Sequence, residues 1–307
     1  MTTILRRATQ WNRPLMLLVA AMAVLTVVAA VGIVADPRVL TGAPIWLKPF
    51  KFAVSFVLYG ATLAWMLSLL PRRSRVAEWA AATIVALSLV EMVVIVAQVI
   101  RGTTSHFNDT TPLNAALFAV MGAAIMVLFA AHLVLGVVLL IRRIPDRVAA
   151  TAVGWGLGLS LLGMLAAVPM VRGTPDPAIE GVSGAHSVGV ADGGPGLPVV
   201  GWSTTGGDLR IGHFVGLHAL QALPILAILL TRYASRLDAR TRVRLLVVAG
   251  TAYGVLTMVL TWQALRGQPL LRPDARTLAV VAALAIATAT ATALVLARRR
   301  PELALAA

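Results

Sequence analysis

The chain contains 307 residues, of which 59% are hydrophobic and only 12% are charged, a balance that excludes an intrinsically disordered protein and is more apolar than an ordinary soluble domain. Its formal net charge of +14 would suggest nucleic-acid binding in a soluble protein, but the basic residues flank apolar runs, so we expect no nucleic-acid partner. The lack of cysteine excludes disulfides, thiolate nucleophiles and iron–sulfur ligation.

Eight apolar runs follow one another along the chain, and each is long enough to cross a bilayer. A transmembrane helix needs about 20 residues to span about 30 Å of hydrocarbon. The runs are longer than barrel strands and lack their alternation, so we predict helices. The predicted spans are residues 14–35, 46–70, 77–100, 113–141, 148–171, 211–231, 245–265 and 277–297. They predict an all-α polytopic transmembrane bundle in which residues 1–307 form a single domain and the lipid bilayer is the main partner.

The first span resembles a signal peptide, because Arg6 and Arg7 precede it and small residues follow it. Its apolar part is longer than that of a usual signal peptide, so we interpret it as an uncleaved anchor. Cleavage near Ala35 would leave seven spans.

Most arginines precede the first span, follow the last span, or lie in every second connection between spans. These positions are all on the same side of the membrane. The positive-inside rule therefore predicts that the N- and C-termini are both cytoplasmic. A preference for Arg, Ala and Val over Lys is typical of GC-rich bacterial genomes, which suggests a bacterial cytoplasmic (inner) membrane.

The longest connection, residues 172–209, lies on the opposite, outer side and is rich in glycine and proline. Turn-forming residues are dense between Asp192 and Pro198. Trp202 and its apolar neighbours then provide side chains that the segment can bury against the helices. We predict an ordered lid over the outer mouth of the bundle, because long ordered loops are usually functional. The alternative is a flexible, solvated loop.

Glu91 is the costliest side chain within the predicted spans. An ionised carboxylate near the bilayer centre costs at least about 2.5 kcal/mol, so such residues usually face a partner or a cavity. Gln98 lies on the same helix face two turns further out, and the polar stripe ends at Arg101. A structural hydrogen bond between helices is the alternative.

Lys48 and Lys51 share a face at the outer end of the second span. Snorkelling toward the lipid headgroups is the simplest interpretation. An inward orientation of Lys51 toward Glu91 is the alternative.

All but one of the histidines lie on the outer side, and the exception, His132, is expected to be a packed, hydrogen-bonded residue. Imidazole and carboxylate groups suit a divalent metal; the candidate ligands are His106, His186, Asp208 and His213. No compact motif such as HExxH supports this site. Haem is disfavoured, because its best pair within the spans, His132 and His218, differs in depth, and only His213 with His106 remains at the rim.

Gly154 and Gly158 form a GxxxG pair in the fifth span. Such pairs let helices approach closely, so we predict a packing surface there, either within the bundle or in a homo-oligomer.

Several strings of residues are distinctive: WLKPFKF at 46–52, RGTTSHFN at 101–108, DGGPGLP at 192–198 and GGDLR with HF at 206–214. Through them the chain, from about residue 46 to 224, resembles a widespread, uncharacterised family of bacterial multi-pass integral membrane proteins. The resemblance implies the membrane fold and brings no mechanism.

We therefore predict an outward-facing pocket for a small polar or anionic ligand, in a protein that serves as a transporter with Glu91 as a proton or cation relay. The predicted ligand-binding residues are Lys48, Lys51, Glu91, Gln98, Arg101, His106, Asp192, Trp202, Asp208, Arg210, His213, His218 and Gln221. The alternatives are a metal-dependent or haem-binding membrane enzyme and a structural or assembly protein. No nucleophile elbow or nucleotide-binding motif is present to name a catalytic residue.

Overall fold

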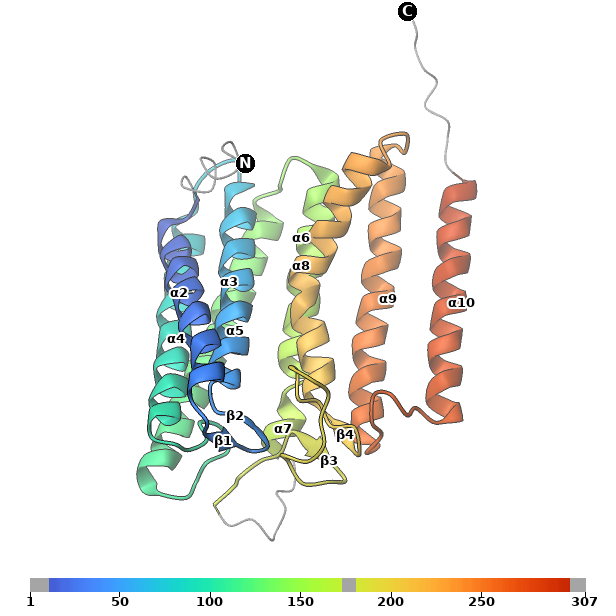
Figure 1. The fold of residues 1–307 in the computed structure, drawn as a ribbon. Coiled ribbons are helices and arrows are strands. Elements are labelled where there is room, and N and C mark those ends of the chain that lie inside the picture. Colours follow the sequence, from blue (N-terminus) through green and yellow to red (C-terminus); the bar gives the residue numbers. More distant parts are fainter. Residues whose placement is uncertain (1–10, 173–180, 299–307) are drawn as a thin grey trace, which may run out of the picture.

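Long helices dominate the computed structural model, which describes residues 11–172 and 181–298 (Figure 1). They are α2 (Arg13–Ala35), α3 (Leu47–Ser68), α4 (Arg75–Ile100), α5 (Pro112–Ile141), α6 (Arg147–Leu165), α8 (Arg210–Tyr233), α9 (Ala239–Leu265) and α10 (Ala275–Ala297). Short α7 (Val168–Arg172) extends the fifth span. Within the described residues, 8 helices are long and apolar enough to cross a membrane. The predicted all-α bundle is confirmed, and the chain is a multi-pass integral membrane protein.

Polar caps set where several of the helices begin. The side chains of Ser74, Asp146 and Asp274 each accept a hydrogen bond from a main-chain N–H in the first turn that follows. Most predicted boundaries agree with the structure to within two or three residues. The largest difference is at α9, which begins at Ala239 rather than 245. Asp238 caps this helix by accepting from Thr241 N at 2.8 Å, so the helix includes a polar, arginine-rich turn that the apolar run does not reveal.

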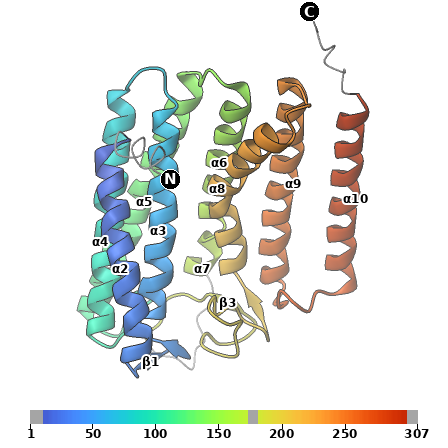
Figure 2. The ribbon, with the colours of Figure 1, turned by 45° about the horizontal axis from the view of Figure 1, so that its top comes forward.

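The helices form two groups that lie side by side in both ribbon views (Figures 1 and 2). One group contains α2 to α5, and the other contains α6, α8, α9 and α10. The groups meet mainly where α5 packs on α6 and where α3 packs on α8. The last helix, α10, packs on α9, and Thr277 is its one buried residue in the described part of the chain.

Close helix packing occurs on a different face of α6 from the predicted one. A Cβ atom on Gly163 would lie 2.3 Å from the main-chain nitrogen of Leu217, so α6 and α8 touch backbone to backbone. In contrast, a Cβ atom on Gly158 would meet nothing within 4 Å, and one on Gly154 would meet only Leu140. The predicted GxxxG pair is therefore not the contact surface within this chain.

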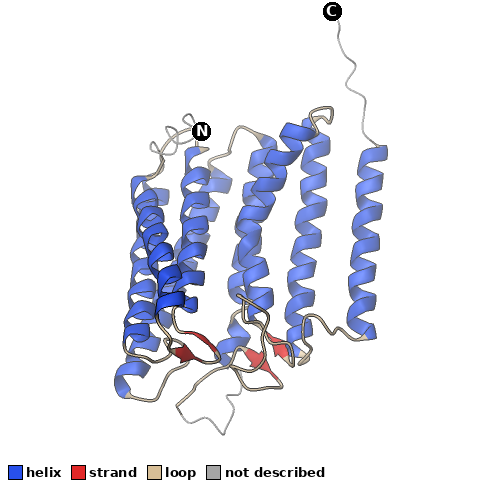
Figure 3. Cartoon of the chain, viewed as in Figure 1, coloured by secondary structure: helices blue, strands red, loops and turns tan. Residues whose placement is uncertain are grey.

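The irregular segments gather at one end of the bundle, opposite the start of α2 and the end of α10 (Figure 3). A hairpin of β1 (Val39–Leu40) and β2 (Ala43–Pro44) lies there, as does an antiparallel pair of β3 (Ser187–Val188) and β4 (Gly207–Asp208). We call residues 181–209 the cap. Residues 173–180 of the predicted lid, and Arg6 and Arg7, lie outside the described residues.

Candidate functional site

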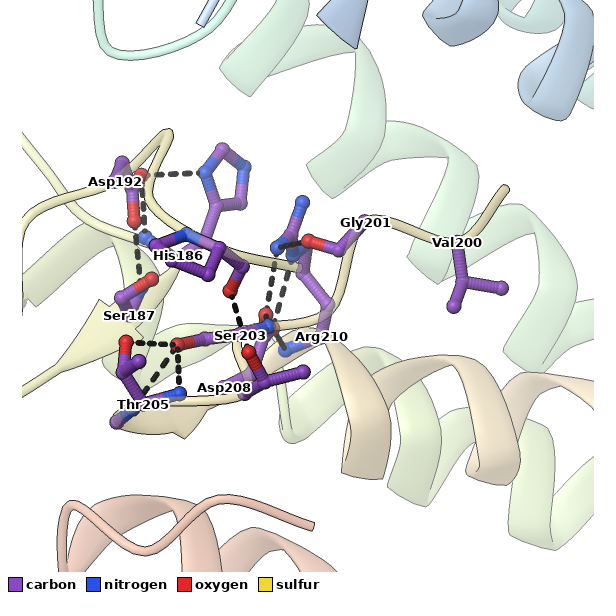
Figure 4. Close-up of polar contacts among 12 residues, drawn as sticks. His186, Ser187, Asp192, Val200, Gly201, Ser203, Thr205, Asp208 and Arg210 are labelled. Atoms are coloured by element: carbon purple, nitrogen blue, oxygen red, sulfur yellow. Dashed lines mark hydrogen bonds and ion pairs between the residues drawn. The ribbon is translucent and has the colours of Figure 1, made fainter. Parts of the chain in front are cut away.

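Two buried or half-buried aspartates organise the cap (Figure 4). Asp192 accepts hydrogen bonds from the main-chain N–H of His186 and of Ser187, and its Oδ2 lies 2.7 Å from His186 Nδ1. Asp208 is 0% exposed. It accepts from Ser203 N at 2.8 Å and from the guanidinium of Arg210 at 2.6 and 2.9 Å. Each carboxylate thus fixes the conformation of the glycine-rich segment around it through hydrogen bonds to main-chain N–H groups.

The cap is attached to the helices beneath it. Arg210, the first residue of α8, donates from its guanidinium to the carbonyl oxygen of Gly201 at 2.6 Å. Lys51 on α3 donates to the carbonyl oxygen of Val200 at 3.0 Å. At Gly207 the cap touches the end of α9 so closely that a Cβ atom would lie 1.9 Å from the carbonyl oxygen of Ala264. The described part of the connection 172–209 therefore packs on the bundle instead of extending into solvent. Trp202 lies half-buried within it.

A chain of three polar side chains lies at the end of the first helix group that is nearest the cap. Lys48 Nζ, on the first turn of α3, lies 3.0 Å from His106 Nδ1. His106 Nε2 lies 3.5 Å from Glu91 Oε1, and Glu91 is 5% exposed. Because an ammonium group can only donate, Nδ1 of His106 acts as an acceptor and its Nε2 carries the proton toward Glu91. Glu91 lies about 14 Å from the C-terminal end of α4 at 1.5 Å per residue.

His106 is held in a neutral form. Its burial lowers the pKa of His106 well below the usual value, and the positive charge of Lys48 lowers it further. The rings of Phe52 and Phe118 lie against the imidazole, with centroids at 5.8 and 6.3 Å. A neutral imidazole with different partners on its two nitrogens can pass a proton from one side to the other.

The cap histidine and its aspartate have shifted pKa values of their own. Burial lowers the pKa of His186, and the Asp192 carboxylate offsets only part of that effect. Burial raises the pKa of Asp192, but the hydrogen bonds that its carboxylate accepts from His186 and Ser187 outweigh this effect and hold the pKa below its usual range. The pair is therefore a neutral imidazole donating to a carboxylate.

The side chains of Gln98 and Arg101 are in contact, as the predicted polar stripe requires, and both donate to Asn114. Arg101 donates from Nη1 to Gln98 Oε1 at 2.5 Å and to Asn114 Oδ1 at 2.9 Å. Gln98 donates to Asn114 Oδ1 at 3.1 Å and to the carbonyl of Thr104 at 3.2 Å. Sequence reasoning missed Asn114, whose one signal is that it is a polar residue in the otherwise apolar first turn of α5. This network fixes the loop that carries His106.

The two histidines of α8 point in different directions, as their spacing predicts. His213 Nδ1 lies 2.8 Å from the carbonyl oxygen of Gly163 on α6. His218 Nδ1 lies 3.3 Å from Gln221 Oε1, and Gln221 donates to Thr62 on α3 at 3.3 Å. Of these contacts, only the one between Gln221 and Thr62 joins the two helix groups. None of them belongs to the Lys48–His106–Glu91 chain.

The four predicted metal ligands do not form a centre. The described residues contain no group of three or more His, Cys, Asp or Glu side chains placed to hold a metal ion. The carboxylate of Asp208 accepts hydrogen bonds from Ser203 and Arg210. The imidazole of His186 is hydrogen-bonded to Asp192. The prediction of a metal site composed of His106, His186, Asp208 and His213 is therefore corrected. The cap aspartates make hydrogen bonds within their own loops instead.

A second polar cluster lies deeper and includes His132, which is 0% exposed. Its Nδ1 lies 2.8 Å from the hydroxyl of Tyr59 on α3, and its Nε2 lies 2.8 Å from Ser160 Oγ on α6. Ser160 donates its own hydrogen to the carbonyl of Leu157 at 2.9 Å. Ser160 must then accept from His132, and His132 from Tyr59. All hydrogen-bonding groups are satisfied, as predicted for His132; its partners were not predicted.

A hollow of about 400 Å³ lies at the opposite end of the bundle, beside Arg143 and Arg147, and includes none of the predicted site residues. Comparisons of the chain with protein-family models, curated proteins and solved structures found no match. The function must therefore be argued from the side chains themselves.

Proposed function

We propose that this protein binds a small anionic solute under the cap, from the outer side of the membrane, and transports it together with a proton held by Glu91. The observation that carries the proposal is the Lys48–His106–Glu91 chain, in which one neutral imidazole joins a cation to a buried carboxylate.

The need for an anion follows from the charges beneath the cap. The ion pairs of the described residues are Asp36–Arg38, Glu91–His106, Asp192–His186, Asp208–Arg210 and Asp274–Arg266. Neither Lys48 nor Lys51 belongs to one, although both are half-buried. A partly desolvated ammonium without a counter-ion is unfavourable, so a carboxylate or phosphate group entering beneath the cap gains two charge-assisted donors.

The proton follows the same chain. Lys48 donates a proton to His106 Nδ1 while His106 Nε2 releases its proton to Glu91 Oε1. The lysine becomes a neutral amine, the imidazole stays neutral with its hydrogen on the other nitrogen, and the carboxylate becomes a carboxylic acid. Lys48 then regains a proton from the outer solution. Glu91 has now lost its negative charge, so the surroundings of both lysines are more positive and the anion binds more tightly. By linkage, a bound anion favours the proton on Glu91 to the same extent.

Transport assays on the full chain in proteoliposomes test the proposal. Radiolabelled inorganic phosphate and succinate serve as probes, and an internal pH dye reports proton entry. We expect uptake accompanied by internal acidification, reduced at least about tenfold, the equivalent of about 1.4 kcal/mol, by Lys48→Met or Glu91→Gln. The matched control is Glu78→Gln on the same helix, because Glu78 accepts from Asn12 at the far end of the bundle. Absence of binding and uptake of both probes by the unmodified protein overturns the proposal.

Orientation and location are part of the proposal. The arginine-rich connections and the cap lie at opposite ends of the bundle, which supports cytoplasmic termini. A bacterial inner membrane and membership of the family that the chain resembles are proposed on the composition and the residue strings of the sequence. The chain has no cysteine, so single cysteines can be labelled without background. A membrane-impermeant maleimide is expected to label Thr205→Cys in intact cells and to leave Ser235→Cys unlabelled. The reverse pattern excludes this orientation.

A further inference from the structure

Two buried oxygen atoms on one face of α4 have no hydrogen-bond partner among the described residues: Glu91 Oε2 and Ser88 Oγ. Ser88 is 0% exposed and Glu91 is 5% exposed. Leaving a buried polar group unsatisfied costs about 1–3 kcal/mol, so an unpartnered pair on one helix face needs an explanation.

The spacing of the pair fits one bridging molecule. Residues three apart on a helix have Cβ atoms about 5–6 Å apart. A water molecule that makes two hydrogen bonds of about 2.8 Å spans that separation. A metal cation fits less well, since the positive charge of Lys48 reaches Glu91 from the outer side and repels it.

We infer that Glu91 and Ser88 together bind an ordered internal water molecule, which serves as the inner partner of the Glu91 carboxyl group. The inference deepens the proposed function, on which it rests for the role of Glu91 as proton carrier. When Glu91 is ionised, the water donates to Oε2 and accepts from the Ser88 hydroxyl. When Glu91 is protonated on Oε1, that O–H donates back to His106 Nε2, and the water still donates to the carbonyl oxygen Oε2. The water and Ser88 therefore keep the same hydrogen bonds in both states.

The serine hydroxyl suits this role because it can donate to the water. Glu91 then has a partner for each oxygen in both of its states: His106 at Oε1 and the water at Oε2. The bridge also lies on the inward side of Glu91. Ile84, one turn beyond Ser88, packs in the same core cluster as Tyr59, so the water extends the polar chain toward the level of the Tyr59–His132–Ser160 cluster.

The test compares Ser88→Ala, which removes the hydroxyl, with Ser88→Thr, which keeps it. The first measurement is the infrared difference spectrum of the purified full chain in water and in ¹⁸O-labelled water. We expect an O–H stretching band that shifts with ¹⁸O, is lost in Ser88→Ala and in Glu91→Leu, and is retained in Ser88→Thr. No solute is needed, so the result stands apart from that of the transport assay.

The sign of a stability change gives the second measurement. If the site holds water, Ser88→Ala removes one of its anchors and lowers the thermal midpoint by about 2–4 °C, equivalent to about 1 kcal/mol. A dry site predicts the opposite sign, because the substitution then deletes an unsatisfied hydroxyl. A direct Ser88–Glu91 hydrogen bond predicts destabilisation without an ¹⁸O-sensitive band. Either of these two outcomes overturns the inference.

Discussion

Lys51 and Arg210 hold two consecutive carbonyl groups of the cap from opposite helix groups. Lys51 on α3 donates to the carbonyl oxygen of Val200 at 3.0 Å. Arg210 on α8 donates to the carbonyl oxygen of Gly201 at 2.6 Å (Figure 4). The cap therefore crosses the line where the two groups meet, and any relative movement of α3 and α8 must strain or release one of these bonds.

Lys51→Met is expected to loosen the cap without unfolding the bundle. A hydrogen bond to a charged group contributes about 1.5–3 kcal/mol, and partial exposure of Lys51 puts this one at the lower end. Main-chain amides between residues 197 and 204 should exchange with deuterium about tenfold faster, measured by mass spectrometry on the detergent-solubilised protein. Lys51→Arg is the control and should retain protection. Unchanged exchange in Lys51→Met would show that the bond does not hold the cap.

Gly163→Ala is expected to be strongly destabilising. The added Cβ atom would overlap the main chain of α8, which cannot move aside as the end of a flexible side chain can. Overpacking typically costs about 1–3 kcal/mol, and a backbone clash lies at the upper end of that range. Thermal unfolding followed by circular dichroism measures the effect. Gly158→Ala, on the same helix with nothing within 4 Å of its new Cβ atom, should change stability little; equal effects in both variants contradict the packing argument.

His132→Leu should destabilise the bundle by about 1–3 kcal/mol, because the buried Tyr59 hydroxyl loses its acceptor. Ser160 keeps its bond to Leu157, so the loss concerns Tyr59 most. A double-mutant cycle with Tyr59→Phe isolates this interaction. The double variant should cost less than the sum of the two single variants. Strict additivity would show that Tyr59 and His132 do not interact.

Stability should fall on acidification below about pH 6.5. The folded-state pKa values of His106 and His186 both lie below the usual value, which is about 6.5 in an unfolded chain. The unfolded state thus binds more protons below that pH, and unfolding becomes easier as pH decreases. The pKa of Asp192 is also lowered, but the stability it adds is lost only as pH falls below about 4.

Thermal midpoints measured between about pH 7.5 and 5 check this expectation. The double variant His106→Gln/His186→Gln should show a flatter dependence over the same range. Lys48, Glu91 and Asp192 face these histidines, so each single variant is measured as well. A slope in the double variant as steep as in the unmodified protein would assign the pH dependence to other groups.

The sequence by itself determined the membrane class, the spans and the side on which the polar residues gather. These features depend on the length and apolarity of each run, which are local properties that any environment must respect. It also singled out Glu91, Gln98, Arg101 and His106 as neighbours of one outer region, because burying a charge within a span is costly wherever the span packs.

Only the tertiary structure decided which of these groups meet. Lys48, and not Lys51, reaches toward Glu91, and it does so through His106 from a separate loop. Asp208 and Asp192 are taken up by their own loops, which removes the predicted metal site. Gly163 and Gly156, outside the GxxxG pair, are the glycines of α6 that lie against the backbone of α8. The reason is the same in each case: the rotation of a helix about its axis and the path of a glycine-rich loop follow from packing between distant segments, which periodicity within one run does not encode.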